Sequence, residues 1–348
     1  MSVYAITIKP GSPFGTPLKG DTLFGQFCWQ AAERPDILKG GLSHWMDCYG
    51  ERPFAVFSSA WPKVQKNGCP YYAIRRPELP LSLLGDPDKN SECEKRLKSR
   101  KENKGRKWLL LKEDLRVQLE WDMMIDDKDL YDLHHAALPE DWQRRLRLIQ
   151  SHHRRPSCNA EQQHNSINRL TMTTGKGEFA PYSTLNTCFL PELEFVIFAY
   201  IDDEACTAER LHEGLSGIGQ WGFGRDASTG LGRFMLIAVE KLTIPQDPAA
   251  DACLTLGPCV PDSSSYQEMF FSPFTRFGRH GAQLLHTGKP FKNPVVMADD
   301  GAVFVTGPGN LPQQPYLGRA VNNISKAQPE AVCQGYSLFL PMQMPALS

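Results

Sequence analysis

The sequence predicts an α+β protein built from two ferredoxin-like (RRM-like) domains, with a long charged insertion and a glycine-rich loop. Three observations support this prediction. The chain opens with a strand, a helix and a second strand, its second half repeats that order, and a highly charged stretch separates the halves. A strand–helix–strand unit used twice is typical of the ferredoxin-like fold. With 348 residues, 41% of them hydrophobic, the chain is long enough for two domains.

The first half begins with a β-favouring run at residues 3–8 that Pro10 and Gly11 end. A turn-rich stretch, residues 11–17, follows it. Asp21 is then placed to cap a helix, because apolar residues recur at helical spacing from residue 23 to residue 31. A second helical stretch is predicted at about residues 37–48 and a strand at residues 54–57.

The middle of the chain is organised by charge. Residues 95–107 contain eight Lys or Arg and one acid, residues 120–132 are acidic, and residues 144–155 are basic again. Such a basic run is typical of a solvated loop or a mobile arm, and neighbouring blocks of opposite charge can also pair with each other. We therefore expect an N-terminal domain at residues 1–185, with a charged insertion at about residues 75–155, and a C-terminal domain at residues 186–348.

The second half repeats the opening. Residues 195–201 form a strong strand candidate, and Thr207 is placed to cap a helix that runs to about residue 215. Six glycines follow within residues 217–232, and the next strand is predicted at residues 235–239. The last strand is predicted at residues 336–340, where Pro341 would stop it.

Composition narrows the function classes. The net charge of −1 argues against a free-standing protein that binds nucleic acid by bulk charge, yet it allows a local basic surface. No apolar run is long enough to span a membrane and the N-terminus does not look like a signal peptide, so we expect a cytoplasmic protein without a membrane segment. The 10 cysteines form no CxxC pair, so we expect reduced core thiols, no structural metal and no cofactor.

The glycine-rich stretch is the most informative motif. Glycines let backbone N–H groups approach an anion, arginine binds phosphate, and hydroxyls bind phosphate or a 2′-hydroxyl. The residues that we assign to RNA binding here are Gly222, Gly224, Arg225, Ser228, Gly230, Gly232 and Arg233. A dinucleotide fingerprint is excluded because the order is helix, glycines, strand, and no GK[ST] follows to make a P-loop. The alternative is a long tight turn.

A second constellation lies at residues 164–171. His164, Asn165, Asn168 and Arg169 offer an imidazole, two amides and a guanidinium, which suit the base edges, sugars and phosphates of single-stranded RNA. The alternative is a polar loop whose side chains cap its own backbone. Catalysis would require a second acid or base near His164, which His152 or His153 could supply.

The start of the first helix is a third candidate. Lys19 and Thr22 flank a helix N-terminus, where free N–H groups and the helix dipole favour an anion. We expect these two residues to hold the bound RNA end or an adjoining subunit, although Asp21 as a cap would partly occupy the same place.

Four segments resemble one family. Residues 13–25 (PFGTPLKGDTLFG) are similar to the N-terminal signature of subunit four of the type III-A CRISPR Csm complex. Residues 164–171 resemble the central His-Asn motif of that family, and residues 222–234 resemble the glycine-rich loop of the wider RAMP superfamily. Residues 334–341 resemble its closing strand. The segments span nearly the whole chain in the order of the family, whereas residues 75–155 match nothing in it.

The resemblance implies a non-catalytic, RNA-binding subunit with two RRM-like folds. Such subunits hold the repeat-derived 5′ handle of the CRISPR RNA (crRNA) and link the large polymerase-like subunit to the backbone RAMP subunits. An RNP1-like aromatic ladder is missing from this sequence, so we expect loops rather than the sheet face to bind RNA.

Two alternatives belong to other classes. A metal-independent endoribonuclease that processes CRISPR repeat RNA would place a His near the first helix, and residues 21–32 contain none. A protein-only scaffold subunit would bind partners without RNA. RNA binding separates the scaffold from the first interpretation, and RNA cleavage separates the ribonuclease.

Overall fold

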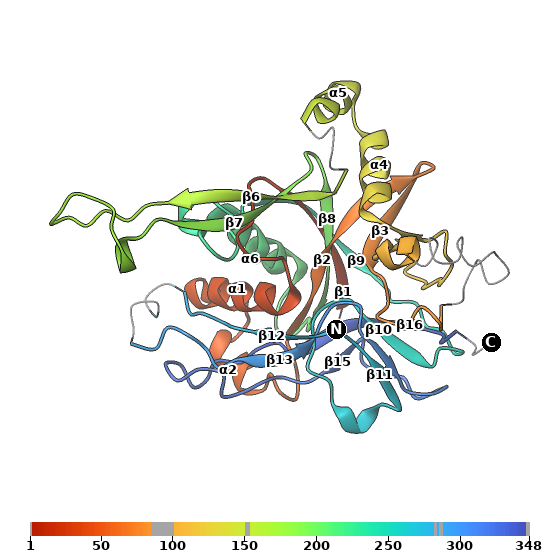
Figure 1. Cartoon of the computed structure of the whole chain (residues 1–348). Helices are drawn as coiled ribbons and strands as arrows, with labels where there is room; N and C mark the ends of the chain where they lie inside the picture. The colour runs from red at the N-terminus through yellow and green to blue at the C-terminus, as the bar shows by residue number, and fades with distance from the viewer. Residues whose placement is uncertain (1, 85–100, 150–153, 282–283, 285–287, 346–348) are drawn as a thin grey trace.

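The computed structural model describes residues 2–84, 101–149, 154–281, 284 and 288–345 (Figure 1). The helices are α1 (Gly20–Glu33), α2 (Leu42–Asp47), α4 (Asp127–Ala137), α5 (Glu140–Ile149) and α6 (Ala208–Trp221). The strands of the largest sheet are β1 (Ser2–Pro10), β2 (Ala55–Lys66), β3 (Cys69–Arg75), β4 (Trp108–Lys112), β5 (Met124–Ile125), β8 (Glu194–Ile201) and β9 (Phe234–Leu242). Within the described ranges, no helix is both long enough and apolar enough to cross a membrane.

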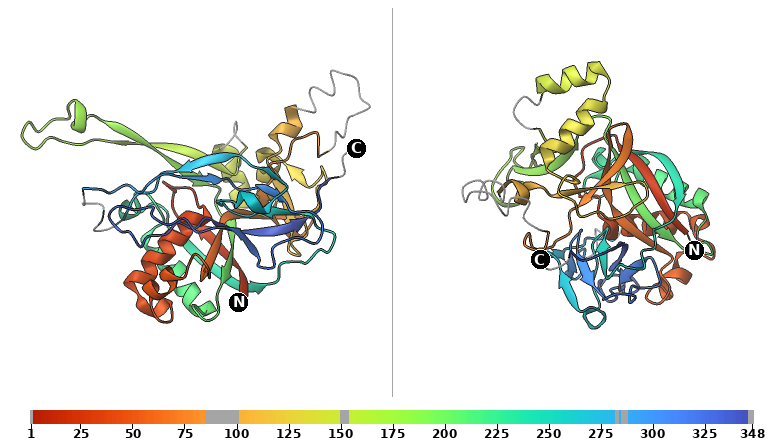
Figure 2. Two further views of the ribbon diagram at one scale, coloured as in Figure 1. Left: turned by 90° about the horizontal axis from the view of Figure 1, so that it is seen from below. Right: turned by 90° about the vertical axis from the view of Figure 1, so that its right-hand side faces the viewer.

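The remaining strands form three smaller groups. The five-stranded sheet contains β10 (Ala252–Thr255), β11 (Glu268–Phe270), β14 (Val303–Val305), β15 (Tyr316–Gly318) and β16 (Tyr336–Met342). Two separate pairs are β6 (Ser157–His164) with β7 (Tyr182–Phe189), and β12 (Pro273–Arg276) with β13 (Val295–Ala298). The β6–β7 pair projects from the body of the molecule, and the β12–β13 pair lies beside α1 (Figures 1 and 2).

The seven-stranded sheet is antiparallel, in the order β5-β4-β3-β2-β8-β1-β9. The units β1–α1–β2 and β8–α6–β9 interlock in it, so that β8 lies between β1 and β2. The order β2-β8-β1-β9 is that of one ferredoxin-like domain. Side chains on both faces of β8 are buried, which places this strand at the centre of the core.

The predicted division into two ferredoxin-like domains is therefore wrong in one respect. The two strand–helix–strand units do not build separate domains at residues 1–185 and 186–348, because β8 and β9 pair with β1 in a single sheet. Each unit alone leaves an open strand edge, and pairing between the units satisfies both. Residues 243–345 form the five-stranded sheet instead, and the described part of this region contains no α-helix.

Helix α6 is longer than the sequence predicts. It continues beyond residue 215 through two glycines to Trp221. A Cβ atom at Gly217 would lie 2.4 Å from Oε1 of Gln30, and one at Gly219 would lie 2.3 Å from the backbone oxygen of Phe234. These glycines therefore let α6 approach α1 and β9 closely, and they belong to the helix rather than to the loop that follows.

Strand β16 also extends further than expected, through Pro341 to Met342. On one side Pro341 pairs with Cys253 of β10. On the other side β15 pairs only with residues 336–338 of β16, so the missing N–H of the proline faces no strand partner.

The charged insertion is only partly described. Residues 95–100 of the basic segment at residues 95–107, which was predicted to be mobile, lie outside the described residues. At its end, Lys107 lies 2.7 Å from Asp127, and Arg154 lies 3.5 Å from Asp132, so basic and acidic blocks do pair. Helices α4 and α5 rise from the sheet in this region (Figure 1).

Candidate nucleic-acid interface

The glycine-rich loop, residues 222–233, folds tightly on itself between α6 and β9. The N–H of Phe223 donates to the backbone oxygen of Gly232 at 2.9 Å. A Cβ at Gly232 would lie 2.1 Å from the backbone oxygen of Phe223, and one at Gly222 would lie 2.3 Å from that of Leu231. The expectation that these two glycines approach a phosphate is therefore corrected: both are buried and serve contacts inside the loop.

The other two glycines differ from each other. Gly224 has a φ of +77°, and a Cβ there would lie 2.5 Å from the Cβ of Thr16, so it packs against the opening turn. Gly230 has a φ of +97° with no heavy atom within 4 Å of the Cβ position. Gly230 and the neighbouring exposed Ser228 thus belong to the part of the loop that a ligand can reach.

The opening turn, residues 11–17, packs against the glycine-rich loop and forms hydrogen bonds with it. Thr16 Oγ1 accepts a hydrogen bond from the N–H of Arg225 at 2.9 Å, and Ser12 Oγ accepts one from the N–H of Arg233 at 2.8 Å. Phe14 is buried between the rings of Phe189 and Phe223, with centroids 5.6 and 6.4 Å away. The signature at residues 13–25 and the glycine-rich loop therefore form one structural unit.

The two arginines of the loop have different surroundings. Nη2 of Arg225 donates to the backbone oxygen of Leu185 at 2.7 Å and to Oδ1 of Asn186 at 2.9 Å. This guanidinium ties the loop to β7, which is a structural role that the sequence did not predict. Arg233 is exposed, and its guanidinium has no ion pair with any described residue. Arg233 is therefore the better candidate for a phosphate contact.

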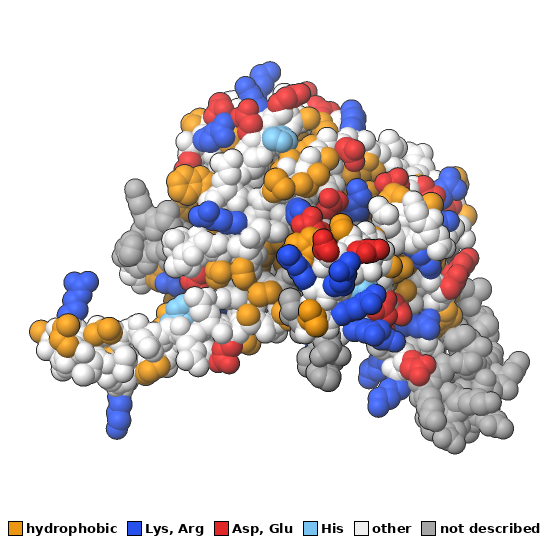
Figure 3. All heavy atoms as spheres, turned by 90° about the horizontal axis from the view of Figure 1, so that it is seen from above, with side chains coloured by type: hydrophobic (Ala, Val, Ile, Leu, Met, Phe, Trp, Pro, Cys, Tyr) orange, Lys and Arg blue, Asp and Glu red, His pale blue; other side chains and the backbone are white. Residues whose placement is uncertain are grey.

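The β6–β7 hairpin projects from the body of the molecule (Figures 1 and 2). Its pairing runs from Ser157↔Phe189 at the base to His164↔Tyr182 near the tip. The sequence did not reveal these strands, because most side chains on both faces of β6 are exposed and no apolar alternation results. Figure 3 shows basic and hydrophobic side chains gathered at the far end of the hairpin.

The His-Asn segment lies at the far end of this hairpin. The His164 ring stacks on Tyr182 with centroids 5.0 Å apart, and its Nε2 lies 3.0 Å from Oγ1 of Thr184. Asn168 Oδ1 accepts a hydrogen bond from the N–H of Leu170 at 2.9 Å, which is the self-capping geometry of the alternative interpretation. Asn165 and Arg169 are exposed. Sequence reasoning missed Tyr182 and three exposed apolar residues of the tip, namely Ile167, Leu170 and Met172.

The glycine-rich loop contacts the base of the β6–β7 hairpin, and the His-Asn segment lies at its far end. The side chains of the two segments therefore do not form a single cluster. Arg225 binds the hairpin at Asn186, which pairs with Ala160, whereas His164 lies four residues further along β6. At about 3.3 Å per residue, that separation is roughly 13 Å, and the tip extends beyond it. We call the loop, the base of the hairpin and its tip the loop–hairpin ridge, consisting of residues 157–189 and 222–233.

Lys19 and Thr22 do not belong to this ridge. The ammonium of Lys19 contacts Oδ1 of Asp299 and lies 3.3 Å from Oδ2 of Asp300, so its charge is already neutralised. Thr22 is half-buried in the first turn of the helix. Asp21 is not a cap: it binds the guanidinium of Arg276 through both oxygens, at 2.6 and 2.9 Å. The helix start thus joins the main sheet to the C-terminal region and offers no free anion site.

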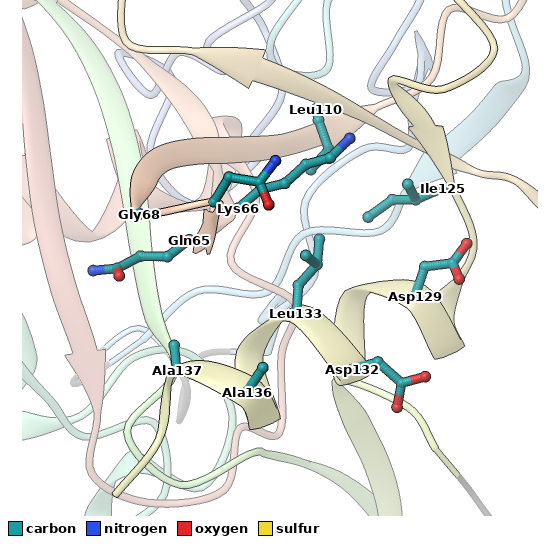
Figure 4. A pocket seen from close by; sticks show the side chains of 11 residues that line it. Gln65, Lys66, Gly68, Leu110, Ile125, Asp129, Asp132, Leu133, Ala136 and Ala137 are labelled. Atoms are coloured by element: carbon teal, nitrogen blue, oxygen red, sulfur yellow. The ribbon is translucent and has the colours of Figure 1, made fainter.

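A pocket lies elsewhere, between the β2–β3 turn and α4 (Figure 4). It has a volume of about 580 Å³, and its floor and rim include Lys66, Leu133, Asp129 and Asp132. It shares no residue with the ridge, and none of the described residues that line it is a His or a Cys. Across the described ranges, no group of three or more His, Cys, Asp or Glu side chains is placed to hold a metal ion, and the described cysteines are free thiols.

Comparison with solved structures places this fold in a class. A chain of the Csm3–Csm4 subcomplex of the type III-A CRISPR-Cas interference complex matches with a TM-score of 0.56 and 13% identity, over 99% of this chain and 100% of that one. A chain of the Csm1–Csm4 cassette with pppApA matches with a TM-score of 0.51 and 15% identity, over 99% and 100%. The cassette with cA4 gives a TM-score of 0.53 and 15% identity, over 99% of each chain. The fold is thus that of a protein subunit of type III CRISPR complexes.

Within this class, Csm4 is the component common to the matching assemblies, so this chain is similar in fold to Csm4. The similarity covers the whole chain, including the C-terminal region that sequence reasoning misassigned. No protein-family model and no curated protein sequence matches the chain.

Proposed function

We propose that this chain is a non-catalytic subunit of a type III CRISPR complex and that it holds the 5′ handle of the crRNA along the loop–hairpin ridge. The observation that carries the proposal is the fold match over 99% of the chain to the Csm3–Csm4 subcomplex of an interference complex. The partners that follow are a large polymerase-like subunit and a backbone RAMP subunit. The matching structures are assemblies of Csm4 with Csm1 or with Csm3.

The chemistry of the ridge supports RNA as its ligand. Arg233 and Arg169 are exposed cations that have no ion pair within the described parts of the chain. Ser228 and Asn165 add an exposed hydroxyl and an exposed amide. Guanidinium groups bind phosphates, while amides and hydroxyls read sugars and base edges, so this mixture suits a single strand.

Cleavage of RNA by this chain is disfavoured by the surroundings of two described histidines, His164 and His134. Among the described residues, the His164 ring contacts Tyr182 and Thr184, and neither is a carboxylate or a second histidine. His152 and His153, the candidate partners for catalysis, lie outside the described residues. His134 is buried, with Nε2 at 2.9 Å from the backbone oxygen of Pro191, and burial lowers its pKa. General acid–base cleavage requires two groups that exchange protons within reach of the same phosphate.

RNA binding by the full chain tests the proposal. We expect Arg233→Ala and Arg169→Ala each to weaken handle binding and to reduce the slope of log K against log salt by about 0.7. Asn165→Ala should instead reduce the preference for handle over scrambled RNA. Arg144→Ala is the matched control, because Arg144 is an exposed arginine on α5, away from the ridge, 3.3 Å from Glu140.

Two outcomes would contradict this function. If both ridge variants keep wild-type affinity and salt slope while partner subunits still bind, the chain is a protein-only scaffold or binds RNA elsewhere. If the purified chain cuts repeat RNA and His164→Ala abolishes the cuts, it is the endoribonuclease of the alternative interpretation. The cleavage assay is run with and without divalent metal.

A further inference from the structure

The segment of residues 270–298 has a charge bias that the loop–hairpin ridge does not explain. It contains four Lys or Arg, five Phe and no Asp or Glu, in a chain whose net charge is −1. Its described part forms an arm made of β12, β13 and their extensions, with bridge Arg279↔Phe291 beyond the paired strands. We call this the β12–β13 arm.

One face of the arm is fixed to the body. Arg276 binds Asp21 of α1 through two hydrogen bonds, and His280 is buried with its Nε2 at 2.7 Å from Oγ of Ser325. Phe274 lies under the Lys19 ammonium and the Arg276 guanidinium, at 4.6 and 5.0 Å from its ring centroid. These contacts hold the backbone in a set position.

The opposite face is open to solvent and carries rings and cations. Along the outgoing strand, Phe277 and Arg279 alternate with the anchored residues, and Phe277 is 76% exposed. On the returning strand, Phe291 is 66% exposed and Lys289 is exposed. The Arg279 guanidinium lies 5.5 Å from the centroid of Phe291. Neither Arg279 nor Lys289 has an ion pair with a described residue.

A surface that combines exposed aromatic rings with unpaired cations matches the chemistry of single-stranded nucleic acid. Exposed rings provide platforms on which any base can stack, and nearby cations without competing acids attract phosphates. An acidic protein would satisfy the cations but would leave two flat rings without a matching partner. We propose that the outer face of the β12–β13 arm is a second contact for single-stranded RNA, with Phe277 and Phe291 stacking on bases and Arg279 and Lys289 near phosphates.

The position of the arm fits this role. The arm runs beside α1 toward the same side of the molecule as the β6–β7 hairpin (Figure 1). An RNA strand bound on the loop–hairpin ridge can therefore continue toward the arm. This inference rests on the proposed function for the identity of the RNA, but the arm itself is separate from the ridge.

A fluorescently labelled 12-nucleotide oligo(A) is the probe, titrated against the full chain. Phe277→Ala and Phe291→Ala should each weaken binding about 5-fold to 100-fold, because base–aromatic stacking contributes on that scale. Phe277→Trp should retain affinity, and quenching of the tryptophan at position 277 by bound RNA is the direct signature of stacking. Val296→Ala is the matched control, since Val296 is 64% exposed on the same arm but has no ring.

The pattern of variants separates the two proposals. Loss in the arm variants with normal binding by Arg233→Ala supports the arm and contradicts the ridge. Loss in Arg233→Ala alone, with no quenching in Phe277→Trp, overturns the arm and leaves the ridge in place. The arm inference also fails if Phe277→Ala impairs assembly with partner subunits while oligo(A) binding is unchanged. Unchanged circular dichroism shows that each variant is folded.

Discussion

At the scale of single residues, the charges at the start of α1 act between distant parts of the chain. Lys19 contacts Asp299 and Asp300, and Asp21 binds Arg276, so three ion pairs join the start of α1 to the β12–β14 region. The sequence placed Lys19 and Asp21 correctly at a helix start. Their partners lie more than 250 residues away, and nothing in local spacing identifies them.

Replacing Lys19 should therefore lower stability. Lys19→Met leaves two adjacent carboxylates without their cation in a mostly buried place, where removing one partner of an ion pair costs roughly 2–4 kcal/mol. Lys9→Met is the control, because Lys9 and Glu192 are more exposed and such surface pairs contribute about 0–1 kcal/mol. Urea unfolding measures both. Equal losses in the two variants would show that the Lys19 cluster has no special role.

The same cluster predicts a pH dependence. Burial raises the pKa of the Asp300 carboxyl to about 6, although the neighbouring Lys19 ammonium opposes the rise. An acid whose pKa is higher in the folded than in the unfolded chain stabilises the fold below about pH 4, and this contribution is lost as pH rises through about 6. Relative to Asp300→Asn, the wild type should lose up to about 3 kcal/mol between pH 4 and pH 7.5.

Urea unfolding of both proteins across this range checks the prediction. Parallel pH profiles for the wild type and Asp300→Asn would contradict it. Asp299 stays available to Lys19 in the variant, so the ion pair is not lost entirely.

At the scale of elements, the glycine-rich loop shows which part of a motif can be predicted. Its position after a helix and before a strand was predicted correctly. The different roles of its glycines were not predicted, because each role depends on which atoms of the folded chain lie close to the Cα of that glycine. The β6–β7 hairpin was missed for another reason: a hairpin exposed on both faces has no hydrophobic period to read.

A pair of alanine substitutions separates these roles. Gly232→Ala combines a φ of +71° with a Cβ only 2.1 Å from a backbone oxygen, and we expect a loss of at least about 3 kcal/mol. Gly230→Ala has a φ of +97° in open space and should cost only about 1–2 kcal/mol. Thermal unfolding of both variants gives the comparison. If Gly230→Ala is the more damaging of the two, the loop is not closed on itself as described.

At the scale of the whole molecule, the order of segments in space differs from their order in the chain. The sequence predicts the element order of both strand–helix–strand units, although β2 and α6 are longer than predicted, and it contains no signal that the units share one sheet. That arrangement follows from pairing of β1 with β8 and β9 across some 200 residues. The region after residue 242 lacks helical periodicity, and its strands gain a core against β2 and β8 and against one another.

Gln334 is the clearest link between the main sheet and the C-terminal region. Its fully buried amide accepts from the N–H of Phe57 at 2.9 Å and donates to the Phe57 and Tyr336 oxygens at 2.8 and 3.1 Å. It thus takes the place of a strand partner beside β2, at the bulge where pairing with β8 shifts register. An apolar side chain there would leave buried backbone groups of both regions without partners.

We therefore predict that Gln334→Leu lowers the stability of the whole molecule by about 2–4 kcal/mol, since each orphaned buried group costs about 1–3 kcal/mol. Gln343→Leu is the matched control, because Gln343 is exposed and its amide reaches only Asp247. Both are followed by near-ultraviolet circular dichroism and by tryptophan fluorescence during thermal unfolding. All seven tryptophans lie in the first 221 residues, so their fluorescence reports the main sheet and its helices.

One hydrophobic cluster includes residues of both sheets. The circular dichroism and fluorescence signals should therefore change together in the wild type and in both variants, and only Gln334→Leu should unfold at a lower temperature. Two separate transitions in the variant would mean that the main sheet and the C-terminal region are stable independently.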